Sequence, residues 1–343
     1  MIAAMLTLLL AAALQSAPPA EEPPVPREAH VFADWVIACD NGRRCQAIGL
    51  RAEGAENDAG FLMVERDAGP DAALTFTLAQ SEGAPARLVM YNQPLPVRLV
   101  AANGDFNLEI SDRAAFLEQI LYADAIEVQN ASGAAIGQLS LNGLRHALLY
   151  MDEAQGRLHT PSALIRAGRR AAADAPPPVP TVRVAPATRE APLVIPPARI
   201  TRARRDNRCA IADVGGPDEA ETAALGGGRT LILLGCGAGA YNFSSVPLIA
   251  TRDGRDIRIE PAPFDIPLDP FEEEDGHRML VNASWDPATM TISEYSKARG
   301  LGDCGSRSTY GWDGGRFRLL AREEMPECRG SLLYLTTWRT ERN

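Results

Sequence analysis

Apolar and polar residues alternate in short runs along most of this chain, and Gly, Pro, Asn or Asp separates one run from the next. This pattern is typical of antiparallel β-strands. In the first half, strands are predicted at residues 35–38, 46–50, 61–65, 73–78, 87–91, 97–100, 106–110, 126–129 and 136–141. In the second half, they are predicted at residues 230–234, 248–251, 257–260, 279–282, 289–295, 308–312, 317–321 and 332–338.

Helical spacing is visible in the first half. Ser111 and Asn142 are expected to cap two helices, because short polar side chains accept the first free backbone N–H groups. Thr160 and Pro161 predict the start of a third, with threonine at the cap and proline at the first helical position. The residues expected on the buried faces are Phe116, Leu117, Ile120, Leu121, Leu144, Ala147, Leu148 and Met151.

A change in composition divides the chain. Eight prolines fall within residues 176–197, a density that predicts an extended linker with no core of its own. The sequence therefore predicts a β-dominated α+β fold with two antiparallel-sheet domains, at residues 28–171 and 201–343, joined by a proline-rich linker at residues 172–200.

The first residues resemble an export signal. Residues 1–17 form an apolar run that is short for a bilayer span, and a Pro/Glu-rich stretch at residues 18–27 follows, which we expect to be a disordered stalk. Cleavage of a signal peptide is predicted, which would leave no membrane span. An uncleaved anchor is the alternative, since no Lys or Arg precedes the apolar run.

Charge restricts the partners. The 343 residues carry a formal net charge of -10, and binding to nucleic acid requires a basic face. No nucleic-acid partner is therefore expected, and nothing in the sequence specifies an oligomeric state.

The cysteines predict covalent cross-links. An even number of cysteines in an exported chain favours disulfides, and pairing in chain order keeps each loop local. If Cys39 pairs with Cys45 across a hairpin, the loop between them must have an odd number of residues. Cys304 and Cys328 would clamp the two ends of a second hairpin. The full set is Cys39, Cys45, Cys209, Cys236, Cys304 and Cys328.

Three patterns imitate catalytic or ligand sites, and none predicts a catalytic residue, a cofactor or a metal. Residues 229–242 resemble a dinucleotide-binding loop, but the residues that follow are poor helix formers, which favours a strand ending in a glycine turn. Residues 265–277 gather six acidic side chains and a histidine without the spacing of a calcium loop. Cys304 and His277 are the nearest approach to a nucleophilic pair, and the cysteine count favours a half-cystine instead.

A candidate binding patch lies on the predicted strand at residues 308–312. Tyr310 and Trp312 are two positions apart, so their side chains point to the same face of the strand. If that face is open, these rings form a binding surface with Arg307 and Arg316 at its edge. The alternative is that both rings belong to the core, where aromatic residues of β-rich domains commonly lie.

Four phrases together resemble a known family. They are DWVIACDNGRRCQAIG at residues 34–49, MDEAQGRLHTPSALIRAG at 151–168, GCGAGAYN at 235–242, and the glycine-rich and cysteine-containing motifs of residues 300–330. The chain resembles the bacterial envelope family called domain of unknown function 1176, and the opening of its first domain is similar to the invasion-associated locus B family. The resemblance implies export and a two-part β-rich organisation, and it supplies no activity.

These observations predict a periplasmic, disulfide-bonded protein that binds another envelope component, either a protein or a glycan, without catalysis. The alternative is an envelope hydrolase whose catalytic carboxylates the sequence does not identify.

Overall fold

A computed structural model describes residues 22–54, 59–171, 175–209 and 220–342. The predicted signal peptide and the first part of the predicted stalk, residues 18–21, lie outside the described residues. Within the described part of the chain, no helix is long and apolar enough to cross a lipid bilayer.

Sheet 1 forms the centre of the N-terminal half. Its strands are all antiparallel and are ordered β1-β2-β3-β4-β5-β9-β8. Their bounds are β1 (His30–Phe32), β2 (Trp35–Cys39), β3 (Cys45–Gly49), β4 (Phe61–Arg66), β5 (Leu74–Ala79), β8 (Val97–Ala102) and β9 (Asp105–Ile110).

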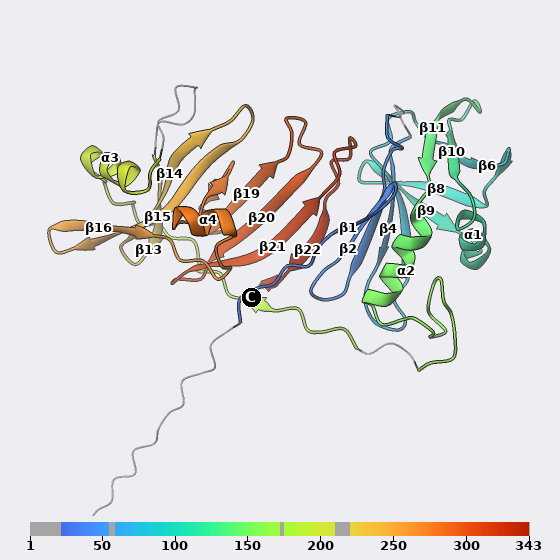
Figure 1. Ribbon diagram of the computed structural model, residues 1–343, viewed down its shortest axis with the longest axis horizontal. Coiled ribbons are helices and arrows are strands. Elements are labelled where there is room, and N and C mark those ends of the chain that lie inside the picture. Colours follow the sequence, from blue (N-terminus) through green and yellow to red (C-terminus); the bar gives the residue numbers. More distant parts are fainter. Residues whose placement is uncertain (1–21, 55–58, 172–174, 210–219, 343) are drawn as a thin grey trace, which may run out of the picture.

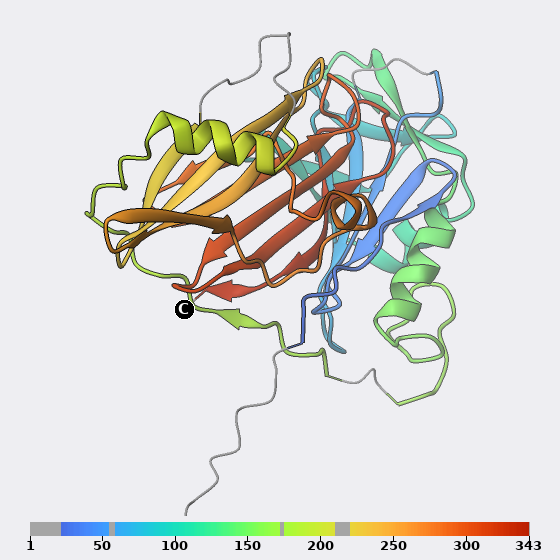
Figure 2. The same cartoon turned by 60° about the vertical axis from the view of Figure 1, so that its left-hand side comes forward.

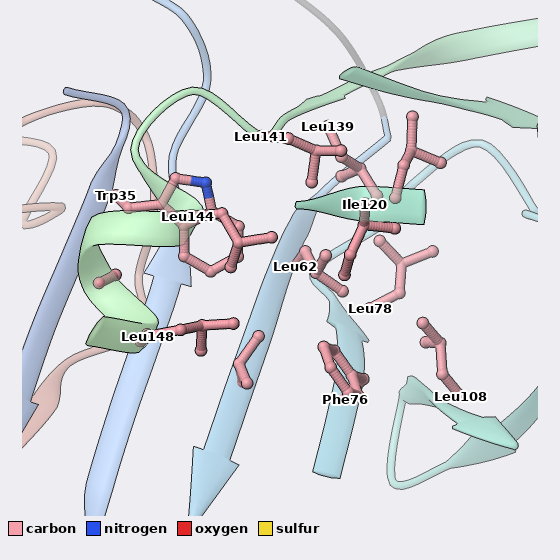
Figure 3. Close-up of a cluster of buried hydrophobic side chains, with 14 of the residues drawn as sticks. Trp35, Leu62, Phe76, Leu78, Leu108, Ile120, Leu139, Leu141, Leu144 and Leu148 are labelled. Atoms are coloured by element: carbon pink, nitrogen blue, oxygen red, sulfur yellow. The ribbon is translucent and has the colours of Figure 1, made fainter. Parts of the chain in front are cut away.

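A smaller antiparallel sheet and two helices cover one face of sheet 1 (Figure 1). Sheet 2 has the order β11-β10-β6-β7, and the helices are α1 and α2. The bounds are β6 (Arg87–Met90), β7 (Gln93–Pro94), β10 (Ala125–Gln129), β11 (Ala135–Ser140), α1 (Arg113–Ile120) and α2 (Leu144–Ala154). Figure 3 shows the apolar core between them, where Trp35 of β2, Phe76 of β5 and Leu148 of α2 point toward one another.

The helix starts differ by one residue from the sequence prediction. Asp112, not Ser111, caps α1, and its Oδ1 accepts a hydrogen bond from the N–H of Ala115 at 3.0 Å. The residue before α2 is Gly143 in a left-handed conformation with φ of 103°, not Asn142. A Cβ atom on Gly143 would lie 1.8 Å from the carbonyl oxygen of Phe32, so β1 approaches too closely for any other residue.

The third predicted helix is wrong. Residues from Thr160 onward form turns, because buried polar groups bind their backbone and side chains. Asp152 accepts hydrogen bonds from the N–H groups of Leu164 at 2.7 Å and Ile165 at 2.9 Å. The Arg157 guanidinium donates to Ser162 Oγ at 3.2 Å.

Two further antiparallel sheets form the C-terminal half. Sheet 3 has the order β13-β14-β15-β16, with β17 also paired to β15, and sheet 4 has the order β18-β19-β20-β21-β22. The bounds are β13 (Ala220–Gly226), β14 (Arg229–Ala238), β15 (Phe243–Asp253), β16 (Asp256–Pro261), β17 (Leu280–Val281), β18 (Ser284–Asp286), β19 (Thr291–Lys297), β20 (Gly305–Trp312), β21 (Phe317–Met325) and β22 (Leu335–Arg339).

Sheet 3 is covered on both faces. Leu231 and Leu233 of β14 face sheet 4, whereas Ile232 and Leu234 point the other way. The second set packs under helix α3 (Pro197–Asp206), which lies across the outer face of the sheet (Figure 2). This explains the unbroken apolar run in β14.

Residues 175–196, where the sequence predicts a linker, lie in contact with the C-terminal half. A short strand, β12 (Thr181–Val182), pairs in parallel with β23 (Glu341–Arg342). Further along, the N–H of Ala185 donates to the carbonyl of Trp312 at 2.7 Å, and that of Leu193 donates to Thr230 Oγ1 at 2.8 Å. The segment leads into α3, which the sequence did not predict.

The two halves share a buried cluster. Val36 and Ala38 of β2 point away from the N-terminal core and pack with Met325 and Leu335 of sheet 4. Polar contacts surround this cluster: Arg329 pairs with Asp34 at 2.6 Å. Because β2 is buried on both faces, its sequence is a continuous apolar run. The prediction of a β-dominated α+β fold built from antiparallel sheets is confirmed.

Candidate binding surface

The cysteines are joined in chain order. Cys39–Cys45 spans a loop of residues 40–44, which has the odd length expected for directly opposed partners. Cys209–Cys236 fixes the end of α3 to β14, and Cys304–Cys328 joins the two open ends of the β20–β21 hairpin. All six sulfurs are therefore used in cross-links, and Cys304 is not available as a nucleophile.

The predicted aromatic patch is not a surface. Tyr310 and Trp312 do share one face of β20, but each is only 1% exposed, because sheet 3 covers that face. Phe264 packs edge-on against the Tyr310 ring at 5.0 Å between centroids, and Phe317 lies 5.1 Å from Trp312. The condition that the face be open fails, and both rings belong to the core.

Arg307 and Arg316 do not gather around those rings. The Arg307 guanidinium lies on the other face of sheet 4, with its carbon 4.6 Å from the ring centroid of Tyr295 and 3.9 Å from that of Tyr334. Arg316 lies beside Asp313, with 3.8 Å between Nε and Oδ2. The structure therefore separates Arg307 from Tyr310 and Trp312, whereas Arg316 lies in the turn that follows Trp312.

The acidic stretch is organised as the start of a helix. Asp269 Oδ1 accepts a hydrogen bond from the N–H of Glu272 at 2.9 Å, and Glu272 Oε2 accepts one from the N–H of Asp269 at 3.0 Å. This reciprocal pair is a capping box for the short helix α4 (Pro270–Asp275). Glu272 also forms an ion pair with Arg278 at 3.3 Å. Throughout the described residues, no three His, Cys, Asp or Glu side chains gather at metal-binding distance.

The glycine-rich run at residues 235–242 is the end of a hairpin. β14 continues through Ala238, and β15 begins at Phe243, so a second strand follows where a nucleotide-binding loop would be followed by a helix. The register shifts between Gly235 and Gly237.

One buried carboxyl group resembles an acid–base residue. Glu294 Oε2 lies 3.4 Å from the Tyr310 hydroxyl, and Oε1 accepts from the N–H of Val281 at 3.3 Å. Burial raises the pKa of Glu294, against the opposing effects of the Val281 N–H and nearby arginines. Burial also raises the pKa of Tyr310. The partners of Glu294 are Tyr310 of β20 and the backbone of β17, so the group serves as a polar link between sheets 4 and 3.

Exposed apolar side chains lie instead on or beside the connections at one end of the C-terminal half. Three connections meet there: the β14–β15 turn, the β19–β20 loop and the chain between β21 and β22 (Figure 1). We call this surface the loop rim. It presents Tyr241, Phe243, Leu301 and Leu332, whose exposed fractions are 37%, 38%, 73% and 52%.

Polar contacts join the three connections of the loop rim. The Tyr241 hydroxyl donates to the carbonyl of Ala298 at 3.0 Å, and the N–H of Gly330 donates to Asp303 Oδ2 at 2.6 Å. The Tyr334 hydroxyl donates to the carbonyl of Gly302 at 3.1 Å. Together with Cys304–Cys328, these contacts hold the loops in place, so the exposed apolar groups are presented by a preorganised frame.

The charge on the loop rim is largely paired. Arg299 donates through Nε to Asp303 Oδ1 at 2.7 Å, with a second contact between Nη2 and Oδ2. The hydrogen bond from Arg299 lowers the pKa of Asp303, although burial of the carboxylate opposes the shift. The exposed ends of the loop rim are therefore apolar, and the charges of Arg299 and Asp303 beneath them offset each other.

Sequence reasoning did not identify the loop rim. The only local signal is Gly300-Leu301-Gly302, where a large apolar residue stands between two glycines. Gly302 has φ of 70°, and a Cβ there would lie 2.5 Å from the Tyr295 hydroxyl. This tight turn leaves Leu301 pointing outward.

Comparison with known proteins agrees with the sequence resemblance. The family described as "Protein of unknown function (DUF1176)" matches residues 29–341. The uncharacterised protein YpfG of Escherichia coli (strain K12) is 29% identical over 347 aligned positions, covering 90% of this chain and 92% of the relative.

One solved structure is also similar. It is the crystal structure of invasion associated protein B from Bartonella henselae, with a TM-score of 0.30 and 14% sequence identity, covering 38% of this chain and 99% of that one.

Proposed function

This chain belongs to the DUF1176 family of proteins of unknown function, and from that premise we propose that it is an exported protein that binds an envelope partner without catalysing a reaction. The observation that carries the proposal is the loop rim. Large exposed apolar side chains grouped on a fixed frame are typical of interaction surfaces, and the covalent and hydrogen-bonded braces reduce the ordering cost of binding.

Export is supported by the use of the cysteines. Disulfides persist in oxidising compartments such as the periplasm, and this chain commits every cysteine to one. The apolar run at residues 1–17 supplies the corresponding signal. We place the protein in the periplasm on these two grounds.

The chemistry of the loop rim favours a protein partner over a glycan. Sugar recognition requires aromatic rings with free polar groups beside them, but the Tyr241 hydroxyl and the Asn242 amide are bonded to the carbonyls of Ala298 and Lys297. Leu301 and Leu332 offer aliphatic groups, which pack into apolar pockets of a partner.

Capture from envelope extracts tests this proposal. The tagged, disulfide-intact chain is compared with Leu301→Asp, which places a charge at the most exposed apolar position of the rim. The matched control is Tyr122→Asp, because Tyr122 is 72% exposed in the N-terminal half. We expect the control to retain proteins that Leu301→Asp loses. Identical capture by both variants contradicts a role for the rim.

The alternative that this protein is a hydrolase is tested by measuring the release of soluble products from cell-wall glycan. Purified protein is incubated with isolated cell-wall glycan, and soluble products are analysed by mass spectrometry. We expect no release above that of a heat-denatured sample. Release that is abolished by Glu294→Gln would favour the hydrolase, since burial raises the pKa of Glu294 and a protonated carboxyl group can act as an acid.

A further inference from the structure

Two cationic side chains lie over one tyrosine ring, on the face of sheet 4 that packs toward the N-terminal half. The guanidinium carbon of Arg307 lies 4.6 Å from the ring centroid of Tyr295, and Lys297 Nζ lies 5.4 Å from it. Tyr295 of β19 pairs directly with Arg307 of β20, and Lys297 is two positions further along β19, so all three share one face. We call these three side chains and Tyr334 the Arg307 site.

Hydrogen bonds fix the two rings of the Arg307 site. The hydroxyl groups of Tyr295 and Tyr334 both donate to the carbonyl of Gly302, the second at 3.1 Å. The Tyr334 ring is buried, and its centroid lies 3.9 Å from the guanidinium carbon of Arg307. Contact with aromatic faces attracts and orients a guanidinium. The position of Arg307 is therefore set before any ligand binds, which reduces the ordering cost of binding.

The N–H donors of these two cations lack acceptors on the protein. Within the residues that the structure describes, neither Arg307 nor Lys297 forms a side-chain hydrogen bond or an ion pair. On the adjoining loop, by contrast, Arg299 is paired with Asp303. Arg307 and Lys297 are both half-buried, and a charge removed from water is costly without a partner of opposite sign. Their several N–H donors therefore suit an anionic ligand.

One carboxyl group limits the charge that the site accepts. Glu323 of β21 is the strand partner of Arg307, but the two side chains do not form an ion pair within the described part of the chain. Burial raises the pKa of Glu323, although Arg307 opposes the shift. Two cations beside one carboxyl group of raised pKa leave an excess of positive charge. That excess suits a singly charged carboxylate better than a doubly charged phosphate.

The Arg307 site adjoins the loop rim. Gly302, whose carbonyl accepts from both tyrosine hydroxyls, directly follows Leu301 of the rim. The carbonyl of Lys297 accepts a hydrogen bond at 2.8 Å from the side-chain amide of Asn242, the neighbour of Tyr241. A partner that packs on the apolar side chains of the rim therefore brings its own polar groups close to these cations. Charge complementarity beside an apolar contact gives specificity.

From the two cations without a counter-ion, the fixed rings and the position beside the loop rim, we infer that the Arg307 site binds a carboxylate of the envelope protein that the rim holds. An Asp or Glu side chain of that partner lies between Arg307 and Lys297, which are diagonal neighbours about 7–8 Å apart on the sheet. The planar guanidinium suits a planar carboxylate. This inference rests on the proposed function, because it gives the chemistry of the partner as an acidic residue flanked by apolar ones.

Lys297 is the only lysine of the chain, so labelling lysine with carbon-13 at Cε gives one side-chain NMR signal. The full disulfide-intact chain is titrated with N-acetylglutamate α-amide and, as the reference, with N-acetylglutamine α-amide, which has a similar shape and no charge. We expect the glutamate compound to shift the signal saturably, with at least tenfold weaker binding of the glutamine compound. Equal affinities would overturn the inference. Saturation by inorganic phosphate at tenfold lower concentration would replace the carboxylate by a phosphate.

Variants locate the site. Arg307→Gln is expected to weaken binding of the glutamate compound at least tenfold, and Arg307→Lys to weaken it less. Glu323→Gln removes the opposing carboxyl group and should strengthen binding at least twofold, a gain that misfolding does not produce. The control is Arg258→Gln, because Arg258 is exposed on β16 and lies 3.5 Å from Glu260. Unchanged binding by Arg307→Gln, no gain by Glu323→Gln, or equal loss in the control contradicts the assignment.

Failure of this inference is separable from failure of the proposed function. Leu301→Asn removes an apolar side chain of the rim without adding charge, and it should leave binding of the glutamate compound unchanged. In capture from envelope extracts, we expect Arg307→Gln to lose the same proteins as Leu301→Asp. If Arg307→Gln retains every protein that Leu301→Asp loses, the inference is wrong and the proposed function stands. If neither variant loses a protein, the proposed function is wrong, and the assignment of the carboxylate to a partner of the rim falls with it.

Discussion

Asp152 has no exposed surface, yet it carries an ionisable group. Arg66 lies 3.7 Å away, and the N–H groups of Leu164 and Ile165 donate to the carboxylate. Burial raises the pKa of Asp152, against these bonds, and burial together with the nearby Arg157 lowers the pKa of Arg66 to about 10. The carboxylate holds the backbone at Leu164 and Ile165, where the sequence predicts a helix.

Removing this carboxylate should be costly. Asp152→Ala leaves two buried N–H groups without their acceptor and removes the negative charge beside the buried Arg66. We therefore expect the free energy of unfolding to fall by about 3–5 kcal/mol. The control is Glu109→Ala, since Glu109 pairs with Arg98 at an exposed site and should cost less than about 1 kcal/mol. Urea denaturation measures both, and similar losses would contradict the account.

Glu294 predicts a pH dependence. Because burial raises its pKa in the folded protein, the folded state binds a proton over a range where the unfolded state has lost it. Stability is therefore lost as pH rises from the unfolded pKa through the folded pKa. Glu294→Gln removes this titration, so the variant should gain stability relative to the wild type as the pH rises above the ordinary pKa of a glutamate. Glu260→Gln, on exposed β16, is the control, and parallel curves for Glu294→Gln would be evidence against the burial effect.

At the residue scale, the sequence predicts which neighbouring residues pair, but it does not predict which strand faces another sheet covers. Cysteine order and loop parity correctly paired Cys39 with Cys45, because both depend on neighbouring strands. The two-residue spacing of Tyr310 and Trp312 correctly predicted that their side chains share one face of the strand. Whether that face is open depends on sheet 3, whose contacts come from residues about 60–80 positions away.

Among the elements, β2 shows how packing determines composition. Trp35 and Ile37 face the N-terminal core, and Val36 and Ala38 face sheet 4. The strand itself was predicted from its apolar run, but its two-sided burial was not. Helix α3 was not predicted, because only Ala203 among its residues is buried, its sequence is rich in arginine, and it begins within the proline-dense stretch.

Gly143 offers a test of element packing. Alanine at this position meets both an unfavourable positive φ and the Phe32 carbonyl oxygen. Gly133 has a similar φ of 88° with nothing within 4 Å of its Cβ position. We expect Gly133→Ala to cost about 1–2 kcal/mol from the backbone alone and Gly143→Ala to cost clearly more. Thermal melts of both variants measure the difference, and equal costs would refute the close approach of β1 to α2.

Across the whole molecule, the halves are coupled by the cluster that contains Val36, Ile48 and Leu335. We expect unfolding in one transition, because separating the halves would expose this cluster. Leu335→Ala should lower the stability of the entire protein by about 2–5 kcal/mol. Denaturation followed by the fluorescence of Trp35 and Trp312, one in each half, tests this with single-tryptophan variants. Different midpoints for the Trp35 and Trp312 variants would show that the halves unfold independently.

The loop rim exists only in the folded molecule as a whole. Its side chains come from residues 241–243, 301 and 332, which are joined only when sheets 3 and 4 pack. Motifs at residues 235–242 and 300–330 indicated family membership, but their proximity could not be read from their spacing. Long-range pairing, which depends on the whole topology, brings them together.

Photo-crosslinking in living cells is the most direct test of the account. A photoreactive amino acid replaces Leu301 of the full exported chain, with replacement of the equally exposed Tyr122 as the reference. We predict discrete crosslinked protein species at position 301 and none at position 122. No species at 301, or the same species at both positions, would contradict the claim that the loop rim binds an envelope protein.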